Sequence, residues 1–254
     1  MTSIPLPILA GQTAVVTGSS SGIGRAMALA LGAAGANVLV HAGHDRQAAE
    51  TVAADIRANG SSADAVAIDL QQPESQDELV RQAWQWRDNI SIWINNAGAD
   101  ILTGDAAKET FEQKLESLWS LDVMATIRLS RQVGERMKAA GGTILNVGWD
   151  GADRGMAGDS GQLFAAAKGA VMAFTRSIAQ SLAPEVRVNC VAPGWIQTAW
   201  GQQASAQWQQ RAARESLAAR WGLPDDVAEV ALWLVSPAAR FVNGQIIHVN
   251  GGRT

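Results

Sequence analysis

Short apolar runs alternate with longer amphipathic stretches along the chain, and no linker separates them. Runs rich in Val, Ile and Leu predict strands near residues 12–17, 36–41, 63–68, 90–95, 142–148, 186–191 and 245–249. The intervening stretches predict helices near 22–34, 46–58, 73–87, 112–139, 161–182 and 224–235. Most strand candidates are continuously apolar, which is typical of strands buried on both faces of a parallel sheet.

Repeated strand–helix units predict an α/β fold with one Rossmann-like, doubly wound domain over residues 1–254. We expect a parallel sheet of about seven strands with helices on both faces. Segment 194–223 is rich in Gln, Ala and Trp, and it predicts a helical insertion over the sheet edge. Ligands of such folds bind at the carboxyl ends of the strands, so candidate chemistry is expected there.

Composition excludes several classes of protein. A net charge of −4 gives no support for nucleic-acid binding or for an anionic membrane surface. The single Cys190 excludes an internal disulfide framework, and the three histidines lack the spacing of metal ligands, so no metal is expected. No signal peptide or membrane-spanning run is found, which predicts a soluble cytoplasmic protein.

A glycine-rich segment, TGSSSGIG at residues 17–24, joins the first predicted strand to the first predicted helix. Glycine can adopt backbone conformations closed to other residues, and it permits close approach of a ligand. The free N–H groups and the positive end of the following helix favour a phosphate. The glycine spacing differs from the commoner dinucleotide fingerprint. The prediction of a phosphate site therefore depends largely on the position of this segment between the first strand and the first helix.

Several further segments follow in a recognisable order. NNAG stands at 95–98, NCVAPG at 189–194 is followed by Thr198, and residues 244–252 form the last predicted strand and a glycine pair. With TGSSSGIG and the Asp69-Leu70 pair, they resemble the classical short-chain dehydrogenase/reductase family over essentially the full chain. The resemblance implies an NAD(P)-binding oxidoreductase.

The resemblance assigns the nicotinamide cofactor to matching positions. The pyrophosphate and the adenosine side would be held by the glycine turn, through Gly18, Ser20, Ser21, Gly22, Ile23 and Gly24. Adenine would contact Asp69 and Leu70, and its ribose would contact Asn96, Ala97 and Gly98. The nicotinamide half would contact Lys168 and the later segment, through Pro193, Gly194, Ile196 and Thr198. The alternative is a vestigial pocket whose residues preserve only the fold.

The second strand bears on the choice between NAD and NADP. Members that prefer NAD usually carry an acidic residue at its end, whereas Ala42 stands there. No carboxylate would repel a 2′-phosphate, and His44 or Arg46 could approach one. However, Ser21 stands where many NADP-dependent members carry a basic residue. We favour NADP(H) over NAD(H), with a solvent-exposed loop as the alternative for both His41 and His44.

The family reaction uses a tyrosine oxygen to transfer the proton, and a lysine ammonium lowers the pKa of that tyrosine. A serine positions the substrate oxygen, and an asparagine supports the lysine. The chain contains no tyrosine. Lys168 is retained, but the resemblance places Phe164 at the tyrosine, Trp149 at the serine and Asp122 at the asparagine. Ordinary alcohol–ketone chemistry is therefore expected to be slow or absent unless another group serves.

Candidate replacements lie in the loop that precedes Phe164. The spacing from Trp149 to Phe164 is longer than usual, so Asp150 or Gly151 could also occupy the serine position. Asp150 and Ser160 are candidate proton donors, and Asp122 is expected to reach Lys168 as a structural partner. The alternative for the loop carboxylates is a solvated surface.

Ten tryptophans are unusual in a chain without tyrosine. Trp149, Trp195 and Trp200 map, with Phe164, around the expected substrate mouth, which suits a flat, apolar or aromatic ligand. Core packing is the alternative. Trp119 lies on the 112–139 stretch, where relatives pair subunits, and the resemblance implies a homotetramer or homodimer through this stretch and 161–182.

Three functions remain open at this point. The first is a divergent NAD(P)-dependent oxidoreductase with a substitute proton donor. The second is an NAD(P)-binding pseudoenzyme with a sensory, structural or partner role. The third is a non-redox lyase or isomerase built on the same pocket.

Overall fold

The fold is centred on one parallel sheet, seen in a computed structural model that describes residues 7–252 apart from the Trp200 side chain. Its seven strands have the order β3-β2-β1-β4-β5-β6-β7. They are β1 (Thr13–Val16), β2 (Asn37–Ala42), β3 (Ala63–Ala67), β4 (Ile92–Asn95), β5 (Gly142–Val147), β6 (Val186–Pro193) and β7 (Ile246–Val249). The chain reverses its direction of travel across the sheet between β3 and β4, which places a ligand crevice beside β1 and β4.

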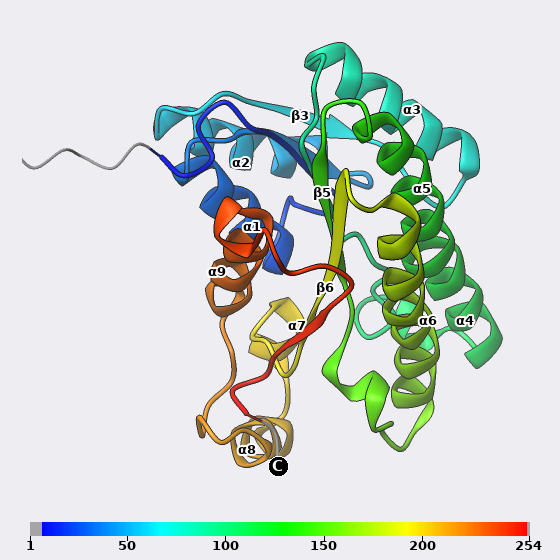
Figure 1. Cartoon of the computed structure of the whole chain (residues 1–254). Helices are drawn as coiled ribbons and strands as arrows, with labels where there is room; N and C mark the ends of the chain where they lie inside the picture. Colours follow the sequence, from blue (N-terminus) through cyan, green and yellow to red (C-terminus); the bar gives the residue numbers. More distant parts are fainter. Residues whose placement is uncertain (1–6, 253–254) are drawn as a thin grey trace, which may run out of the picture.

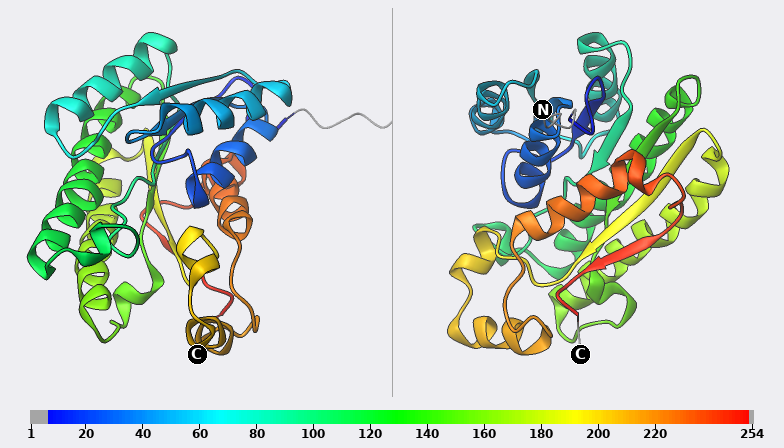
Figure 2. Two further views of the ribbon diagram at one scale, coloured as in Figure 1. Left: turned by 180° about the vertical axis from the view of Figure 1, so that it is seen from behind. Right: turned by 60° about the vertical axis from the view of Figure 1, so that its left-hand side comes forward.

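Helices cover both faces of the sheet, as Figures 1 and 2 show. One face carries α1 (Gly22–Ala33), α2 (Arg46–Ala58) and α9 (Pro224–Val235). The other carries α3 (Pro73–Trp86), α5 (Thr126–Met137) and α6 (Asp159–Leu182), and α4 (Phe111–Leu118) packs beside α6. This arrangement confirms the predicted doubly wound α/β fold.

The strand register explains why continuous apolar runs are needed. Leu39, Val15, Trp93, Ile144 and Val188 are successive partners across five strands, and all five pack toward α3, α5 and α6. The preceding and following positions on β1 and β4 pack toward α1, α2 and α9 instead. Because successive side chains of a strand point to opposite faces, both sets must be apolar.

The predicted helix over 112–139 is interrupted. It starts at Phe111, where Thr110 and Gln113 form a reciprocal capping box, and α5 ends at Met137. Between α4 and α5, residues Trp119–Ala125 form a π-helical segment. π-helical segments are rare in proteins, and those that occur often lie at functional sites. Here the segment contains Asp122, whose side chain is turned inward to partners on other elements.

Segment 194–223 contains two short helices, α7 (Ala199–Gln203) and α8 (Ala206–Glu215). Its two ends meet, because the Gly222 N–H donates to the Trp195 carbonyl at 2.9 Å and the Gln197 N–H to the Gly222 carbonyl at 2.8 Å. Figure 2 shows this excursion beyond the carboxyl end of β6, rather than alongside the sheet edge. It therefore contributes one wall to whatever binds there.

Candidate nicotinamide-cofactor and substrate site

The glycine turn between β1 and α1 has the geometry of a phosphate cradle. Gly18 and Gly22 have φ of +62° and +55°, the left-handed region that glycine adopts without strain. A Cβ at Gly24 would lie 2.2 Å from the Gly18 carbonyl oxygen and 2.4 Å from Asn96 Nδ2. Position 24 thus has no room for a side chain, and the turn presents the N-terminus of α1, where N–H groups favour a phosphate. These residues fit the pyrophosphate of a dinucleotide.

Two side chains bind the glycine turn to the end of β4. Thr17 Oγ1 accepts the N–H groups of Asn96 and Ala97, each at 3.0 Å. In return, Asn96 Nδ2 donates to the carbonyls of Thr17 and Gly18, at 3.0 and 2.9 Å. Below them, Asn95 Nδ2 donates to Asn146 Oδ1 at 2.9 Å, which ties β4 to β5. The TGSSSGIG and NNAG segments therefore form one rigid unit.

His41 clamps the same turn from β2. Its Nδ1 accepts the Gly18 N–H at 3.0 Å, and its Nε2 lies 2.8 Å from the Ile68 carbonyl. This requires the neutral ring with the proton on Nε2. Its backbone also exchanges hydrogen bonds with Ser19, since the His41 N–H donates to Ser19 Oγ and the Ser19 N–H donates to the His41 carbonyl. His41 is 1% exposed, so the alternative of an exposed loop is wrong for this residue.

Burial lowers the pKa of His41 from 6.5 to about 4, against opposing contributions from the Ile68 hydrogen bond and the Asp69 charge. The folded protein therefore binds this proton less tightly than the unfolded chain. The resulting stability is complete above pH 6.5 and is lost as the pH falls through about 4. We expect this group to contribute about 3 kcal/mol of pH-dependent unfolding free energy.

His41→Asn is expected to remove that part of the pH dependence, because the amide does not titrate. Urea unfolding of the wild type and the variant between pH 4 and pH 7.5 measures the difference. Carboxylates contribute to both profiles alike, so the comparison isolates His41. Parallel profiles would contradict the assignment.

The adenosine side lies at the ends of β2 and β3. Asp69 is partly exposed, and its carboxylate lies 3.5 Å from Nε2 of the exposed His44. Leu70 is 1% exposed and packs in the core, and its carbonyl accepts a hydrogen bond from Gln76 Nε2 at 2.9 Å. Ala42 is buried, and the Arg46 side chain is exposed at the start of α2. This side of the site contains Asp69 as an acidic group and Arg46 and His44 as candidate basic groups.

A cavity of about 520 Å³ opens at the carboxyl ends of β5 and β6. Phe164 and Lys168 face it from one side of α6, since residues four apart share a helix face. Trp149 follows β5 and meets Phe164 edge-on, with ring centroids 6.3 Å apart. The remaining residues that line the cavity include cofactor candidates from both halves: Ile23, Asn96, Pro193, Gly194, Ile196 and Thr198.

Segment 194–223 supplies an aromatic wall to this cavity. The Trp195 ring packs against those of Trp208 and Trp221, at centroid distances of 5.3 and 6.1 Å. Glu215 holds the cluster, because its carboxylate accepts Trp195 Nε1–H at 2.9 Å and Arg211 Nε–H at 2.7 Å. Trp208 and Trp221 were not among the sequence-based candidates. The predicted Trp200 side chain lies outside the described part of the structure.

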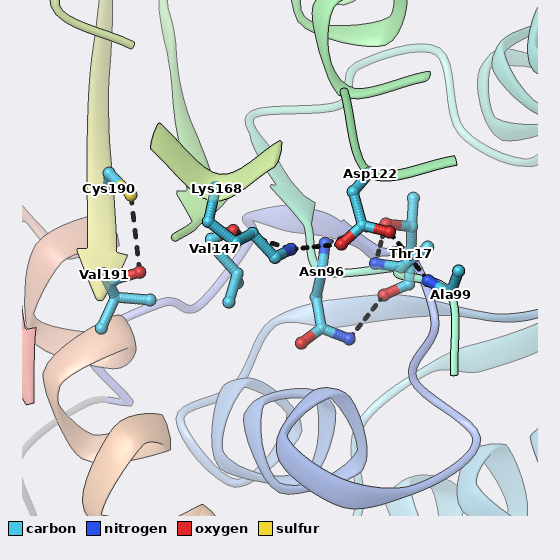
Figure 3. Close-up of polar contacts among 9 residues, drawn as sticks. Thr17, Asn96, Ala99, Asp122, Val147, Lys168, Cys190 and Val191 are labelled. Atoms are coloured by element: carbon cyan, nitrogen blue, oxygen red, sulfur yellow. Dashed lines mark hydrogen bonds and ion pairs between the residues drawn. The ribbon is translucent and has the colours of Figure 1, made fainter. Parts of the chain in front are cut away.

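Lys168 and Asp122 form a buried ion pair, with Nζ 2.7 Å from Oδ2 (Figure 3). Lys168 also donates to the Val147 carbonyl at 3.3 Å. The second carboxylate oxygen, Asp122 Oδ1, accepts the Ala99 N–H at 2.8 Å. A Cβ at Gly98 would lie 2.9 Å from Asp122 Oδ2, so the NNAG turn covers the carboxylate closely. The ammonium is thus oriented by Asp122 and Val147 rather than by a phenol.

The two loop candidates separate in the structure. Ser160 lines the aromatic cavity, close to the start of α6. Asp150 is 3% exposed and borders a different cavity with Asp153, Arg154, His248 and Asn250. Its Oδ2 accepts Asn250 Nδ2–H at 3.2 Å, which joins the loop after β5 to the end of β7. Asp150 therefore joins two parts of the fold, whereas Ser160 is a hydroxyl residue that lines the cavity.

Cys190 lies beneath the site on β6. Burial raises the pKa of this thiol to about 12, so it stays protonated at neutral pH and is a poor nucleophile. Over residues 7–252, no group of three or more His, Cys, Asp or Glu residues is arranged to hold a metal ion. Within that same range, none of the helices combines the length and the apolar character needed to cross a membrane.

Comparison with known proteins identifies the family of the chain. Residues 18–254 match the model of the family described as enoyl-(acyl carrier protein) reductase. The 3-oxoacyl-[acyl-carrier-protein] reductase of Synechocystis sp. is 35% identical over 251 residues, which cover 96% of this chain and 97% of that protein. A short-chain dehydrogenase from Burkholderia cenocepacia, solved in complex with NADP, has a TM-score of 0.85 at 31% identity and covers 96% and 98% of the two chains.

A 7α-hydroxysteroid dehydrogenase, solved with NADH and 7-oxo glycochenodeoxycholic acid, superimposes with a TM-score of 0.88. It is 29% identical, and the match covers 100% of this chain and 98% of that chain. The parallel sheet and the glycine turn define a protein of the Rossmann type. More specifically, the chain belongs to the classical short-chain dehydrogenase/reductase family.

Proposed function

We propose that the protein is an NAD(P)-dependent oxidoreductase with an atypical active site, which acts on a flat, apolar or aromatic substrate and prefers NADP(H). The aromatic cavity carries this proposal, because it joins the cofactor candidates Gly194 and Thr198 to rings of Trp149, Phe164 and Trp195. When bound, the cofactor supplies or accepts a hydride. The aromatic side chains of the cavity hold the substrate ring by stacking.

The side chains around Lys168 support a departure from tyrosine-based chemistry. Phe164 has no proton to give, and Trp149 fills the neighbouring space without a hydroxyl. The Lys168 ammonium is neutralised by Asp122. We infer that the proton moves to or from the Ser160 hydroxyl or a water beside it, since Ser160 is a hydroxyl that lines this cavity.

Removal of the Ser160 hydroxyl tests this assignment. Ser160→Ala is expected to lower the turnover of an aromatic ketone, such as 2-tetralone or 1-acenaphthenone, by about 10²-fold while NADPH binding is unchanged. Absorbance at 340 nm follows the reaction. Asp159→Asn, a change at the adjacent exposed position, is the matched control and should have no effect. Equal rates for wild type and Ser160→Ala would remove Ser160 from the mechanism.

Cofactor choice is tested by titration. We expect NADPH to bind more tightly than NADH, since Ala42 offers no carboxylate to repel a 2′-phosphate and Arg46 stands nearby in the sequence. Arg46→Ala should weaken NADPH about fivefold and leave NADH unchanged, because an exposed ion pair contributes at most about 1 kcal/mol. Energy transfer from tryptophan to the dihydronicotinamide measures both. Tighter NADH binding would reverse the preference.

A second candidate function is an NAD(P)-binding protein without turnover, acting as a sensor, a structural subunit or a partner. The observation that favours it is the Lys168–Asp122 ion pair, because Asp122 binds the ammonium that relatives of this family would use in catalysis. A lyase or isomerase in the same cavity is the remaining non-redox alternative. Absence of turnover together with intact NADPH binding would favour these candidates over the oxidoreductase.

We further propose a cytoplasmic homotetramer or homodimer. Trp119 and Met124 support pairing through the 112–139 region, because they are 45% and 42% exposed on a helical surface in the single chain. On α6, the small side chains of Ala166 and Ala170 would let a second subunit approach closely. Closed symmetry would cover these apolar groups.

A further inference from the structure

We propose that Asp122 biases the site toward the oxidised cofactor, NAD(P)⁺, over the reduced form. The inference rests on the proposed cofactor binding, and it adds the redox state that the pocket selects.

The charges next to the cavity are few. Among the described residues that line it, Lys168 is the charged one. Directly behind it, the Asp122 carboxylate is 2% exposed and lies 2.7 Å from the ammonium. Phe164 and Trp149 add no ionisable group. The lysine and the aspartate therefore form a pair without net charge at this wall of the cavity. The buried Asp150 carboxylate, 3.4 Å from a Cβ placed at Gly194, is common to the wild type and every variant below.

Burial keeps these charges effective. The Lys168 side chain is 12% exposed, and the cavity wall in front of it is mostly aromatic or aliphatic. Charges in such surroundings are screened less than on a surface, and they act at an effective dielectric of about 20 over several ångströms. The nicotinamide-side candidates Pro193, Gly194 and Thr198 line the same cavity as Lys168.

The two redox states of the cofactor differ in charge at the nicotinamide ring. The oxidised ring carries one positive charge, and the reduced ring carries none. A free Lys168 ammonium would repel the oxidised ring, whereas the carboxylate of Asp122 cancels that repulsion. Because the reduced ring is neutral, it gains little from either group. Asp122 thus stabilises bound NAD(P)⁺ selectively. In an enzyme, this favours hydride removal from a substrate. In a protein without turnover, it makes the occupancy of the site depend on the concentration of NAD(P)⁺.

Thermodynamic cycles on the full-length protein test this bias. Dissociation constants for NADP⁺ and NADPH are measured by isothermal titration calorimetry on wild type, Asp122→Asn, Lys168→Met and the double variant. Asp122→Asn keeps an oxygen acceptor for the Ala99 N–H, removes the charge and turns an Nδ2–H₂ donor toward Lys168. We expect the NADP⁺/NADPH affinity ratio to fall about tenfold in Asp122→Asn, to rise in Lys168→Met and to return near wild type in the double variant.

Asp105→Asn is the matched control, since it makes the same chemical change on a side chain that is 99% exposed and should leave the ratio unchanged. A ratio unaffected by Asp122→Asn, or one that shifts toward NADP⁺, overturns the proposal. If Asp122→Asn does not fold, the rise expected in Lys168→Met decides alone, and its absence overturns the proposal. Failure of the wild type to bind either form would instead overturn the proposed cofactor function.

Discussion

Phe164→Tyr alone leaves carbonyl reduction near background, whereas the combined variant Phe164→Tyr, Trp149→Ser, Asp122→Asn raises it by about 10²-fold or more. The single change returns a phenol beside Lys168, but the ammonium stays bound to Asp122 at 2.7 Å. A paired ammonium cannot lower the pKa of the new phenol effectively. The Trp149 ring also remains against position 164 and offers no hydroxyl to the substrate oxygen.

Steady-state NADPH oxidation with small ketones and diketones measures the series. The double variant Phe164→Tyr, Trp149→Ser is expected to have intermediate activity, because it restores the proton donor and the polarising hydroxyl while Asp122 still competes for Lys168. Effects within one site are not additive, so each combination must be compared directly. Full recovery by Phe164→Tyr alone would show that Trp149 and Asp122 are not obstacles.

The strand pattern was sufficient to predict the fold. Continuous apolar runs such as 143–147 identify strands covered on both faces, and the register places Ile144 and Leu145 against opposite helical layers. The interruption at Trp119–Ala125 was not predictable, because a seven-residue π-helical stretch between two α-helices is too short to show a hydrophobic period of its own. The inward position of Asp122 depends on this interruption and on partners from two other elements.

The site was predictable where one short segment determines it and unpredictable where distant segments meet. Residues 17–24 carry their own turn geometry, so the cradle follows from the glycines. His41, in contrast, has no local signal for its role. Its ring bonds to Gly18 and Ile68, which are distant in sequence and meet only through strand pairing. Trp208 and Trp221 reach the cavity because segment 194–223 folds back on itself.

Gly24→Ala is expected to weaken cofactor binding severely while the fold persists. The added methyl would lie 2.2 Å from the Gly18 carbonyl oxygen and 2.4 Å from Asn96 Nδ2, and the backbone oxygen cannot move without displacing the phosphate cradle. Overpacking of this kind costs about 1–3 kcal/mol of unfolding free energy. We expect NADPH affinity to fall at least about a hundredfold, because the N–H groups of the turn lose their alignment.

Gly169→Ala provides the matched control on a helix. A Cβ there meets no atom within 4 Å, so the change should leave NADPH binding intact and add about 0.5–1 kcal/mol of stability from helix propensity. Gly22→Ala is expected to lie between the two, since its Cβ has an ordinary 3.6 Å contact with Thr198 but its φ of +55° strains alanine by about 1–2 kcal/mol. Fluorescence titration gives the affinities, and circular dichroism with urea unfolding confirms that each variant is folded. Wild-type affinity in a folded Gly24→Ala protein would show that this turn does not hold the pyrophosphate, and the cofactor assignment would then lose its structural basis.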